Sequence, residues 1–146
     1  ELIDIIASVT PLENLILLAN LDFAWEQDAD FDLDGDGISD TDENVNWWGI
    51  AGYIVYDLNE IIRLALRGEY FVDDDGFRTG TEQDLFEITP TISIKPFAGK
   101  QGLDNLVLRF EYRFDHSDED VFEDDDGDFK DTQHTVATEL LYYFSL

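Results

Sequence analysis

The stretch from Leu106 to Asp115 reads LVLRFEYRFD, and it decides the fold class of the chain. Its alternate positions from Leu106 are apolar or aromatic, while the positions between them carry charges from Arg109 onward. Successive side chains of a β-strand point to opposite faces, so this period of two predicts a strand with one oily and one ionic face. Aromatic residues in the oily row and charges of both signs in the other are typical of a strand between lipid and a polar lumen.

The same period of two recurs along the chain and predicts about seven strands. They are expected at residues 1–10, 15–26, 46–57, 61–72, 85–95, 106–115 and 134–144. No run of eighteen apolar residues occurs in the sequence, so a membrane-spanning helix is not expected. The pattern predicts an all-β fold, an antiparallel up-and-down transmembrane β-barrel, as the single domain of residues 1–146.

The connections between the predicted strands differ in length and charge. Shorter turns alternate with long acidic loops, which are expected at 27–45, 73–84 and 116–132. In an up-and-down sheet this alternation puts the long loops at one end, as in barrels whose long loops are extracellular. Seven strands would leave the chain ends on opposite sides, whereas bacterial barrels usually have an even number. We therefore expect eight or more strands in the closed barrel, completed by upstream strands of a longer barrel or by further chains, as in a homo-oligomer.

Composition excludes several classes of protein. The formal net charge of -27 argues against a nucleic-acid partner, because binding to phosphates needs Lys and Arg. The chain has no cysteine, which excludes thiol catalysis. Glu69 and Glu111 could imitate the carboxylate pair of a hydrolase, but neighbouring arginines would keep both ionised. His116 and His134 are interpreted as surface residues, and we expect that the protein is not an enzyme.

Three segments carry a resemblance to a known family. They read WWGIAGYIVYDLNEIIRLALRGEYFVDDDGFRTG at 47–80, NLVLRFEYRFDHSDEDVF at 105–122 and DTQHTVATELLYYF at 131–144. Together these segments resemble the C-terminal part of the OmpL-like β-barrel porins of Gram-negative outer membranes. The resemblance implies a protein of the bacterial outer membrane, in contact with its lipid, that forms a pore. It also implies a longer parent barrel. Proteins of this family usually end on an aromatic residue, whereas here Ser145 and Leu146 follow Phe144.

The ionic rows contain the residues that are expected to line the lumen. Placing an Arg or Lys toward lipid near the bilayer midplane costs about 2–4 kcal/mol, so the inward orientation is favoured. The predicted lumen-lining residues are Arg63, Arg67, Glu69, Glu87, Lys95, Arg109, Glu111, Arg113, Asp115 and Glu139. They could pair across strands and stiffen the barrel, or they could form a basic ladder opposite acids that selects solutes.

The first acidic loop contains a possible calcium site. Asp32, Asp34, Asp36, Asp40 and Glu43, together with Gly37, fit the spacing D-x-D-x-D-G-x-x-D-x-x-E of an EF-hand loop. The segment LDGDGISDTDE also resembles a thrombospondin type 3 calcium repeat. Alternating carboxylates on a loop that bends at glycine can converge on one Ca²⁺ ion. The alternative is a solvated acidic loop, which is also the interpretation of the clusters Asp73–Asp75 and Asp124–Asp128.

Three interpretations of the protein agree with these patterns. The first is an outer-membrane porin-like channel for passive diffusion of small hydrophilic solutes through a charged lumen. The second is a non-conducting surface barrel whose calcium-bound loops serve adhesion or packing. The third is a soluble barrel or sandwich with an apolar core, because periodicity alone does not show which face is inside.

Overall fold

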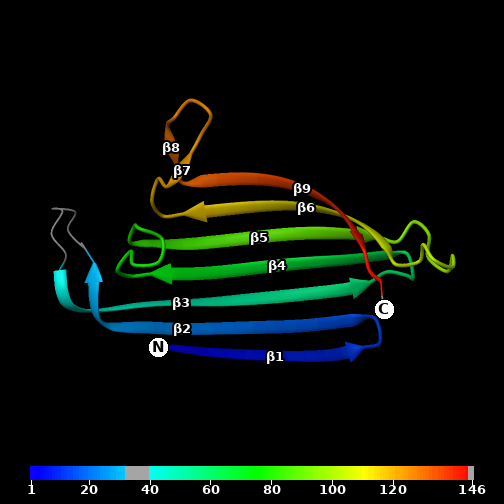
Figure 1. Cartoon of the computed structure of the whole chain (residues 1–146), viewed down its shortest axis with the longest axis horizontal. Coiled ribbons are helices and arrows are strands. Elements are labelled where there is room, and N and C mark those ends of the chain that lie inside the picture. The colour runs from blue at the N-terminus through cyan, green and yellow to red at the C-terminus, as the bar shows by residue number, and fades with distance from the viewer. Residues whose placement is uncertain (32–39, 145–146) are drawn as a thin grey trace.

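The alternating rows of the sequence form β-strands in the computed structural model, which describes residues 1–31 and 40–144. Seven strands build one antiparallel sheet, in the order β1 (Leu2–Leu12), β2 (Leu15–Phe31), β3 (Asp40–Asp57), β4 (Ile62–Asp73), β5 (Gln83–Ile94), β6 (Leu106–Ser117) and β9 (Thr132–Tyr142) (Figure 1). A separate hairpin consists of β7 (Phe122–Glu123) and β8 (Phe129–Lys130). The predicted all-β antiparallel fold is confirmed. Within the described residues no helix has the length and apolarity needed to cross a membrane.

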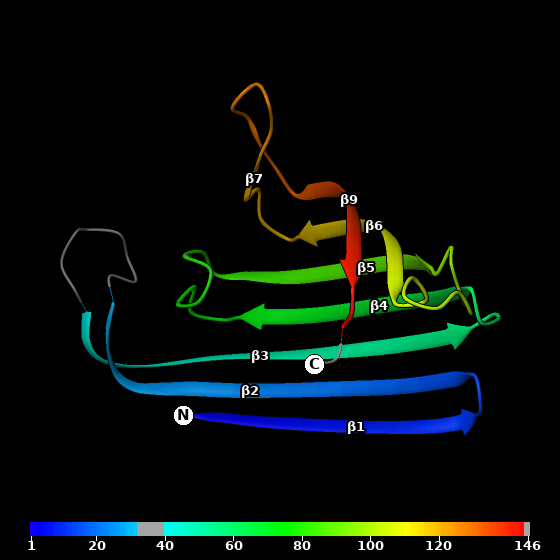
Figure 2. The same cartoon turned by 45° about the vertical axis from the view of Figure 1, so that its right-hand side comes forward.

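The sheet is a meander with two free edges. Each strand pairs with its neighbour in sequence, except that β6 pairs with β9 across the small hairpin. Figure 2 shows β9 turned strongly relative to β3, so the sheet is twisted and curved. It is not closed, because β1 and β9 form its edges in the part of the chain that the structure describes. With seven strands in an antiparallel meander, the two edge strands run in the same direction.

The pairing register places the oily rows of all seven strands on one face. Leu21 of β2 lies opposite Ile5 of β1 and Ile50 of β3, and Ile50 lies opposite Tyr70 of β4. Directly opposite residues of an antiparallel sheet share a face, so these rows join into one apolar band. The band is open to its surroundings: Ile50, for example, is 48% exposed. The predicted rows are therefore continuous across the sheet.

The β2–β3 ladder continues farther than the sequence pattern indicates. The acidic segment was expected to be a loop from residue 27 to residue 45, yet β2 extends to Phe31 and β3 begins at Asp40. Strand pairing rests on backbone hydrogen bonds, and outside a bilayer acidic side chains do not prevent it. Register shifts on both sides of Ala29 accompany this extension, as expected where bulges relieve an irregular ladder.

The connections lie at two opposite ends of the sheet (Figure 1). At one end, here called the turn end, are residues 13–14, 58–61 and 95–105. The other, here called the loop end, has residues 74–82 and the segment that contains β7 and β8. The expected length alternation fails at one place, because 95–105 is longer than 74–82. Gly99 and Gly102 have positive φ in this longer connection, which allows it to turn repeatedly.

Pro90 lies in the central strand β5, where a proline removes one hydrogen-bond donor from the ladder. The β5–β6 pairs stop at Ile88 with Phe114 and resume at Thr91 with Glu111 in an unchanged register. On the other side, Pro90 still lies opposite Leu66 of β4. The sheet therefore accommodates this proline without a bulge.

Candidate functional site

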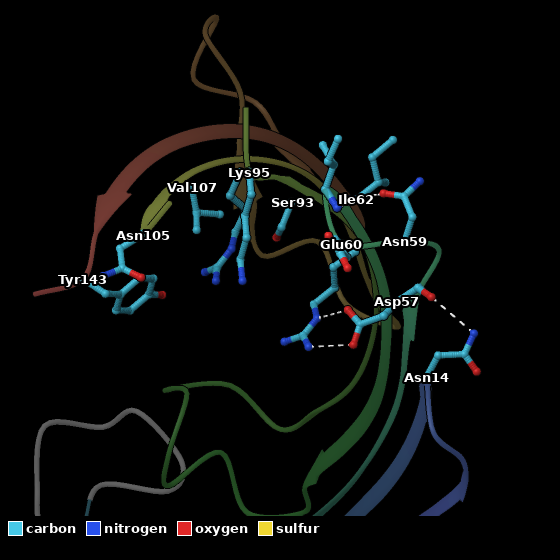
Figure 3. A pocket seen from close by; sticks show the side chains of 13 residues that line it. Asn14, Asp57, Asn59, Glu60, Ile62, Ser93, Lys95, Asn105, Val107 and Tyr143 are labelled. Carbon is cyan, nitrogen blue, oxygen red and sulfur yellow. Dashed lines mark hydrogen bonds and ion pairs between the residues drawn. The ribbon is translucent and has the colours of Figure 1, made fainter. Parts of the chain in front are cut away.

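The face opposite the apolar band is concave and ionic. In Figure 3 the ribbon arches over the side chains of Ser93, Lys95 and Val107, which all belong to the rows between the apolar residues. The structure brings all the predicted lumen-lining residues to this concave face, because the strand register aligns them across the sheet. Arg63 lies opposite Ser93, Ser93 opposite Arg109, and Arg109 opposite Glu139. In the same way Glu87 lies between Glu69 and Asp115, and Thr91 lies opposite Glu111.

Arg67 is the central cation of the face. It forms ion pairs with Glu69 of its own strand and with Glu87 of β5, and the Thr89 hydroxyl also donates a hydrogen bond to Glu87. Tyr53 of β3 lies beneath the guanidinium, 5.8 Å from ring centroid to Cζ. Glu87 is only 4% exposed, so its charge needs these partners.

A second arginine holds the next acid of the same row. Arg113 and Asp115 lie two residues apart on β6, and their side chains meet at 2.6 Å between Nη2 and Oδ1. The Nε of Arg113 also donates to Oδ1 at 2.8 Å. The carboxylates of Glu69, Glu87 and Asp115 are neighbours on adjacent strands, where like charges repel. The two arginines offset this repulsion, and the Arg67–Glu87 pair also links β4 to β5.

Two further pairs lie toward the turn end and are more open. Arg63 holds Asp57 in a forked pair, with Nε to Oδ1 at 2.6 Å and Nη2 to Oδ2 at 2.8 Å. Arg109 reaches Glu139 at 3.0 Å through Nη1. Water screens such exposed pairs, so their contribution to stability is small. Glu111 accepts a hydrogen bond from Thr91 at 3.2 Å and lies two strands away from Glu69, so these two carboxylates do not form a dyad.

Residues 74–82 fold back against the concave face, which the sequence reasoning did not foresee. Asp73 is fully buried, and its Oδ2 accepts hydrogen bonds from the backbone of Arg78 and Thr79 and from the Thr79 hydroxyl at 2.8–2.9 Å. Arg78 lies over Trp47 of β3 at 5.3 Å, and Phe77 stacks on the same ring at 5.6 Å. The cluster read as a solvated loop thus contains the residue that fastens the loop.

A hollow of about 720 Å³ lies between this loop and the strands. Its lining combines aromatic, small and paired charged side chains, among them Trp47, Ala51, Tyr53, Arg67, Glu69 and Arg78. The doublet Trp47–Trp48 could have indicated this position, since adjacent strand residues face opposite sides and one tryptophan must face the ionic side. Gly76 permits the tight turn of the loop: its φ is +65°, and an added Cβ would lie 2.7 Å from the backbone N of Glu82.

The predicted calcium ligands lie mostly outside the part of the chain that the structure describes. Asp32, Asp34 and Asp36 fall outside the described residues, and the structure describes the backbone but not the side chains of Asp40 and Glu43. The described residues contain no group of three or more acidic or histidine side chains suited to a metal ion. The calcium site therefore stays a prediction.

The other acidic cluster organises the β7–β8 hairpin. Asp124 pairs with Lys130, and its Oδ1 accepts backbone hydrogen bonds from Asp126 and Asp128 at 2.9 and 3.1 Å. The hydrogen bond from Lys130, followed by those from the two backbone N–H groups, lowers the pKa of Asp124 below its ordinary value. Its carboxylate therefore acts as the centre of a tight turn.

The two histidines are exposed, as expected, and have different neighbours. His116 lies 4.0 Å from Asp131 between Nδ1 and Oδ2. His134 contacts the Tyr112 hydroxyl at 2.7 Å and packs beside the ring of Phe114 at 5.2 Å. Neither histidine shares a metal-binding group with other described residues.

The comparison with protein families agrees with this arrangement of an apolar outer band around an ionic concave face. The family model described as Putative beta-barrel porin-2, OmpL-like matches residues 1–144. The chain belongs to this family. Membership in the OmpL-like porins makes the chain a β-barrel porin-type protein of the bacterial outer membrane, a class that is typically non-enzymatic. No curated protein and no solved structure matches the chain.

Proposed function

We propose that the chain forms part of the wall of a water-filled pore through which small hydrophilic solutes diffuse passively across the outer membrane. The observation that carries this proposal is the segregation of the two faces. Strand residues Leu21, Ile50 and Tyr70 lie in one exposed apolar band, whereas Arg67 and Glu87 form ion pairs on the opposite concave face. A bilayer on the convex side and water on the concave side satisfy both faces.

Closure of the pore needs strands beyond these seven. The edges β1 and β9 run in the same direction, so an odd number of additional strands would let both edges pair in the antiparallel way. We propose that such strands, from the same protein or from a further chain, complete the barrel. The seven strands then line one side of the lumen, and the acidic connections at the loop end face the cell exterior.

The β4–β5 loop narrows this lumen in the proposal. Asp73 fastens the loop, and Arg78 and Thr79 line the same hollow as Arg67 and Glu69 of β4. A solute that passes along the concave face would meet paired charges and aromatic rings at this level. We therefore expect the pore to favour small hydrophilic solutes.

Adjacent residues of β3 offer a matched test of this function. Ala51 is buried on the concave face and lines the hollow, whereas an added Cβ at Gly52 meets no atom within 4 Å on the apolar side. In planar-bilayer recordings of the full barrel we expect steady conductance, strongly reduced by Ala51→Trp and nearly unchanged by Gly52→Trp. A fully inserted wild-type barrel without conductance would refute the pore.

Calcium binding is a separate proposal, supported by the spacing of Asp32, Asp34, Asp36, Asp40 and Glu43. Isothermal titration calorimetry of the full barrel is expected to show uptake of Ca²⁺ that Asp34→Asn with Asp36→Asn abolishes. Asp125→Asn, in the other acidic loop, is the matched control. Calcium uptake by a non-conducting barrel would favour the surface-barrel function, in which the acidic loops serve adhesion or packing.

A further inference from the structure

A second hollow, of about 580 Å³, lies at the turn end of the concave face. Its lining comes from the ends of β3 to β6, from the 58–61 turn and from Asn105 and Tyr143 near the end of β9. In Figure 3 Lys95 and Ser93 point into the space beneath the arch, while Asn105 and Tyr143 lie across it. Donor groups from distant parts of the chain therefore face one space.

Basic side chains outnumber acidic ones in this hollow. Arg63, Lys95 and Arg109 line it together with the acids Asp57 and Glu60. The register explains the cluster, because Ser93 lies between Arg63 and Arg109, and Lys95 follows Ser93 on the same face. Diagonal neighbours on adjacent strands are about 7–8 Å apart, so the three cations share one patch. This excess is local, since the chain as a whole carries a formal charge of -27.

Lys95 is the cation of this patch that forms no ion pair among the described residues, although the charge of Asp57 acts on it from beyond ion-pair distance. Arg63 forms a forked ion pair with Asp57, and Arg109 donates one hydrogen bond to Glu139. Elsewhere Arg78 and Lys100 lie over aromatic rings. Within residues 1–31 and 40–144, Lys95 has neither a carboxylate within ion-pair distance nor a ring beneath its ammonium group. Lys95 is exposed, so its charge is accessible to a ligand that enters the hollow.

The remaining polar groups of the hollow are suited to an anion. Ser93 and Tyr143 carry hydroxyl groups and Asn105 an amide, and all three can donate hydrogen bonds. Arg109 still has N–H groups that do not bond to Glu139. We propose that this hollow is a binding site for a free oxyanion, phosphate or carboxylate, held by Lys95 and Arg109 through charge-assisted hydrogen bonds. Its use in transport rests on the proposed pore, but the binding itself does not.

Binding of inorganic phosphate to the full barrel in detergent tests the site without any conductance. Phosphorus NMR at pH 7 is expected to show saturable line broadening with wild-type protein. Lys95→Gln should bind about tenfold more weakly, which is the expected loss of one charge-assisted hydrogen bond. Lys95→Arg should retain binding, because it keeps the charge. Lys100→Gln is the matched control, since Lys100 lies over Phe97 and does not line the hollow.

Two results would overturn the assignment: wild-type protein that does not broaden the phosphate signal, or Lys95→Gln that broadens it like wild type. A barrel that binds phosphate but does not conduct would refute the proposed pore and support the oxyanion site. A barrel that conducts without binding phosphate would refute the oxyanion site and leave the pore. The titration is repeated in bilayer discs with and without phosphatidylglycerol. Unchanged phosphate binding is expected, and its loss with the anionic lipid would assign the hollow to a lipid headgroup instead.

Discussion

The two faces of β4 share one backbone and the same neighbouring strands, yet they differ in every property that matters for function. The row of Leu64, Leu66 and Tyr70 is apolar and exposed, with Leu66 at 39%. The row of Arg67 and Glu69 is ionic and bonded to its neighbours. A water-soluble sheet would bury the first row and expose the second. The contrast supports the proposed division of the solvent, with hydrocarbon on the convex side and water on the concave side.

The largest effect is expected when the two faces of β4 receive the same charge. Leu66→Arg would place a guanidinium toward hydrocarbon near the middle of the strand, at a cost of about 2–4 kcal/mol in unfolding free energy. Ala65→Arg, one residue earlier, faces the concave side between Val55 and Thr91 and should cost far less. Urea unfolding of the barrel in lipid vesicles measures both. Equal costs at the two positions would contradict the assignment of the faces.

A smaller effect should separate two ion pairs of the concave face. Arg67→Ala removes a partner of Glu87, which is 4% exposed, so we expect a loss of about 2–3 kcal/mol from the uncompensated charge. Arg109→Ala removes a pair whose side chains are 36% and 50% exposed, and the loss should stay below about 1 kcal/mol.

The same vesicle unfolding assay compares these two variants. The double variant Arg67→Ala with Glu87→Gln should recover much of the stability, because it also removes the buried charge. If Arg109→Ala proved the more harmful single change, the claim that the buried Arg67–Glu87 pair contributes more to stability than the exposed Arg109–Glu139 pair would be wrong.

The strand rows could be predicted from the sequence because period-two alternation is a local property. The row Leu106, Leu108, Phe110 and Tyr112 predicts β6 within a few residues, and β4 and β5 are similarly close. Once the rows are known, antiparallel pairing brings the predicted ionic residues onto one face. That part of the candidate site therefore follows from the alternation alone.

The rest depends on contacts that no short pattern contains. Asp73 reads as one of three acids in a turn, and only the fold shows that its carboxylate is buried beneath residues 78 and 79. The extension of β2 to Phe31 depends on pairing with β3 and not on hydrophobicity. The open sheet agrees with the expectation that seven strands need further strands to close, although alternation does not indicate how β1 and β9 are placed relative to each other.

The attachment of the β4–β5 loop to the concave face offers a further comparison between neighbours. Asp73→Ala removes the acceptor of three hydrogen bonds, and we expect about tenfold faster amide exchange at Arg78 and Thr79, or about 1 kcal/mol. Asp74→Ala changes an exposed acid next to it and should leave exchange unchanged. If the loop narrows the lumen, the conductance of the Asp73→Ala barrel should also rise. Unaltered exchange would show that the aromatic contacts of Trp47 and the hydrogen bonds from Asn46 to Asp75 hold the loop without Asp73.

The smallest effect is expected where neither face of the sheet is involved, in the β7–β8 hairpin. The hydrogen bond from Lys130 lowers the pKa of Asp124, and such a depressed pKa means that the folded hairpin favours the ionised carboxylate. Its stabilisation is thus fully present above the unfolded pKa of about 3.9 and is lost as pH falls through the lower folded value.

Amide exchange at Asp126 and Asp128, whose N–H groups bond to Asp124, should therefore accelerate only below about pH 4. Asp124→Asn should remove this pH dependence, whereas Asp125→Asn, at a neighbouring exposed position, should retain it. Because the hairpin lies outside the seven-stranded sheet, strand amides such as those of β5 should not respond in this range. A simultaneous response of β5 would show that the hairpin and the sheet unfold as one unit, and that the loop end contributes to the stability of the wall.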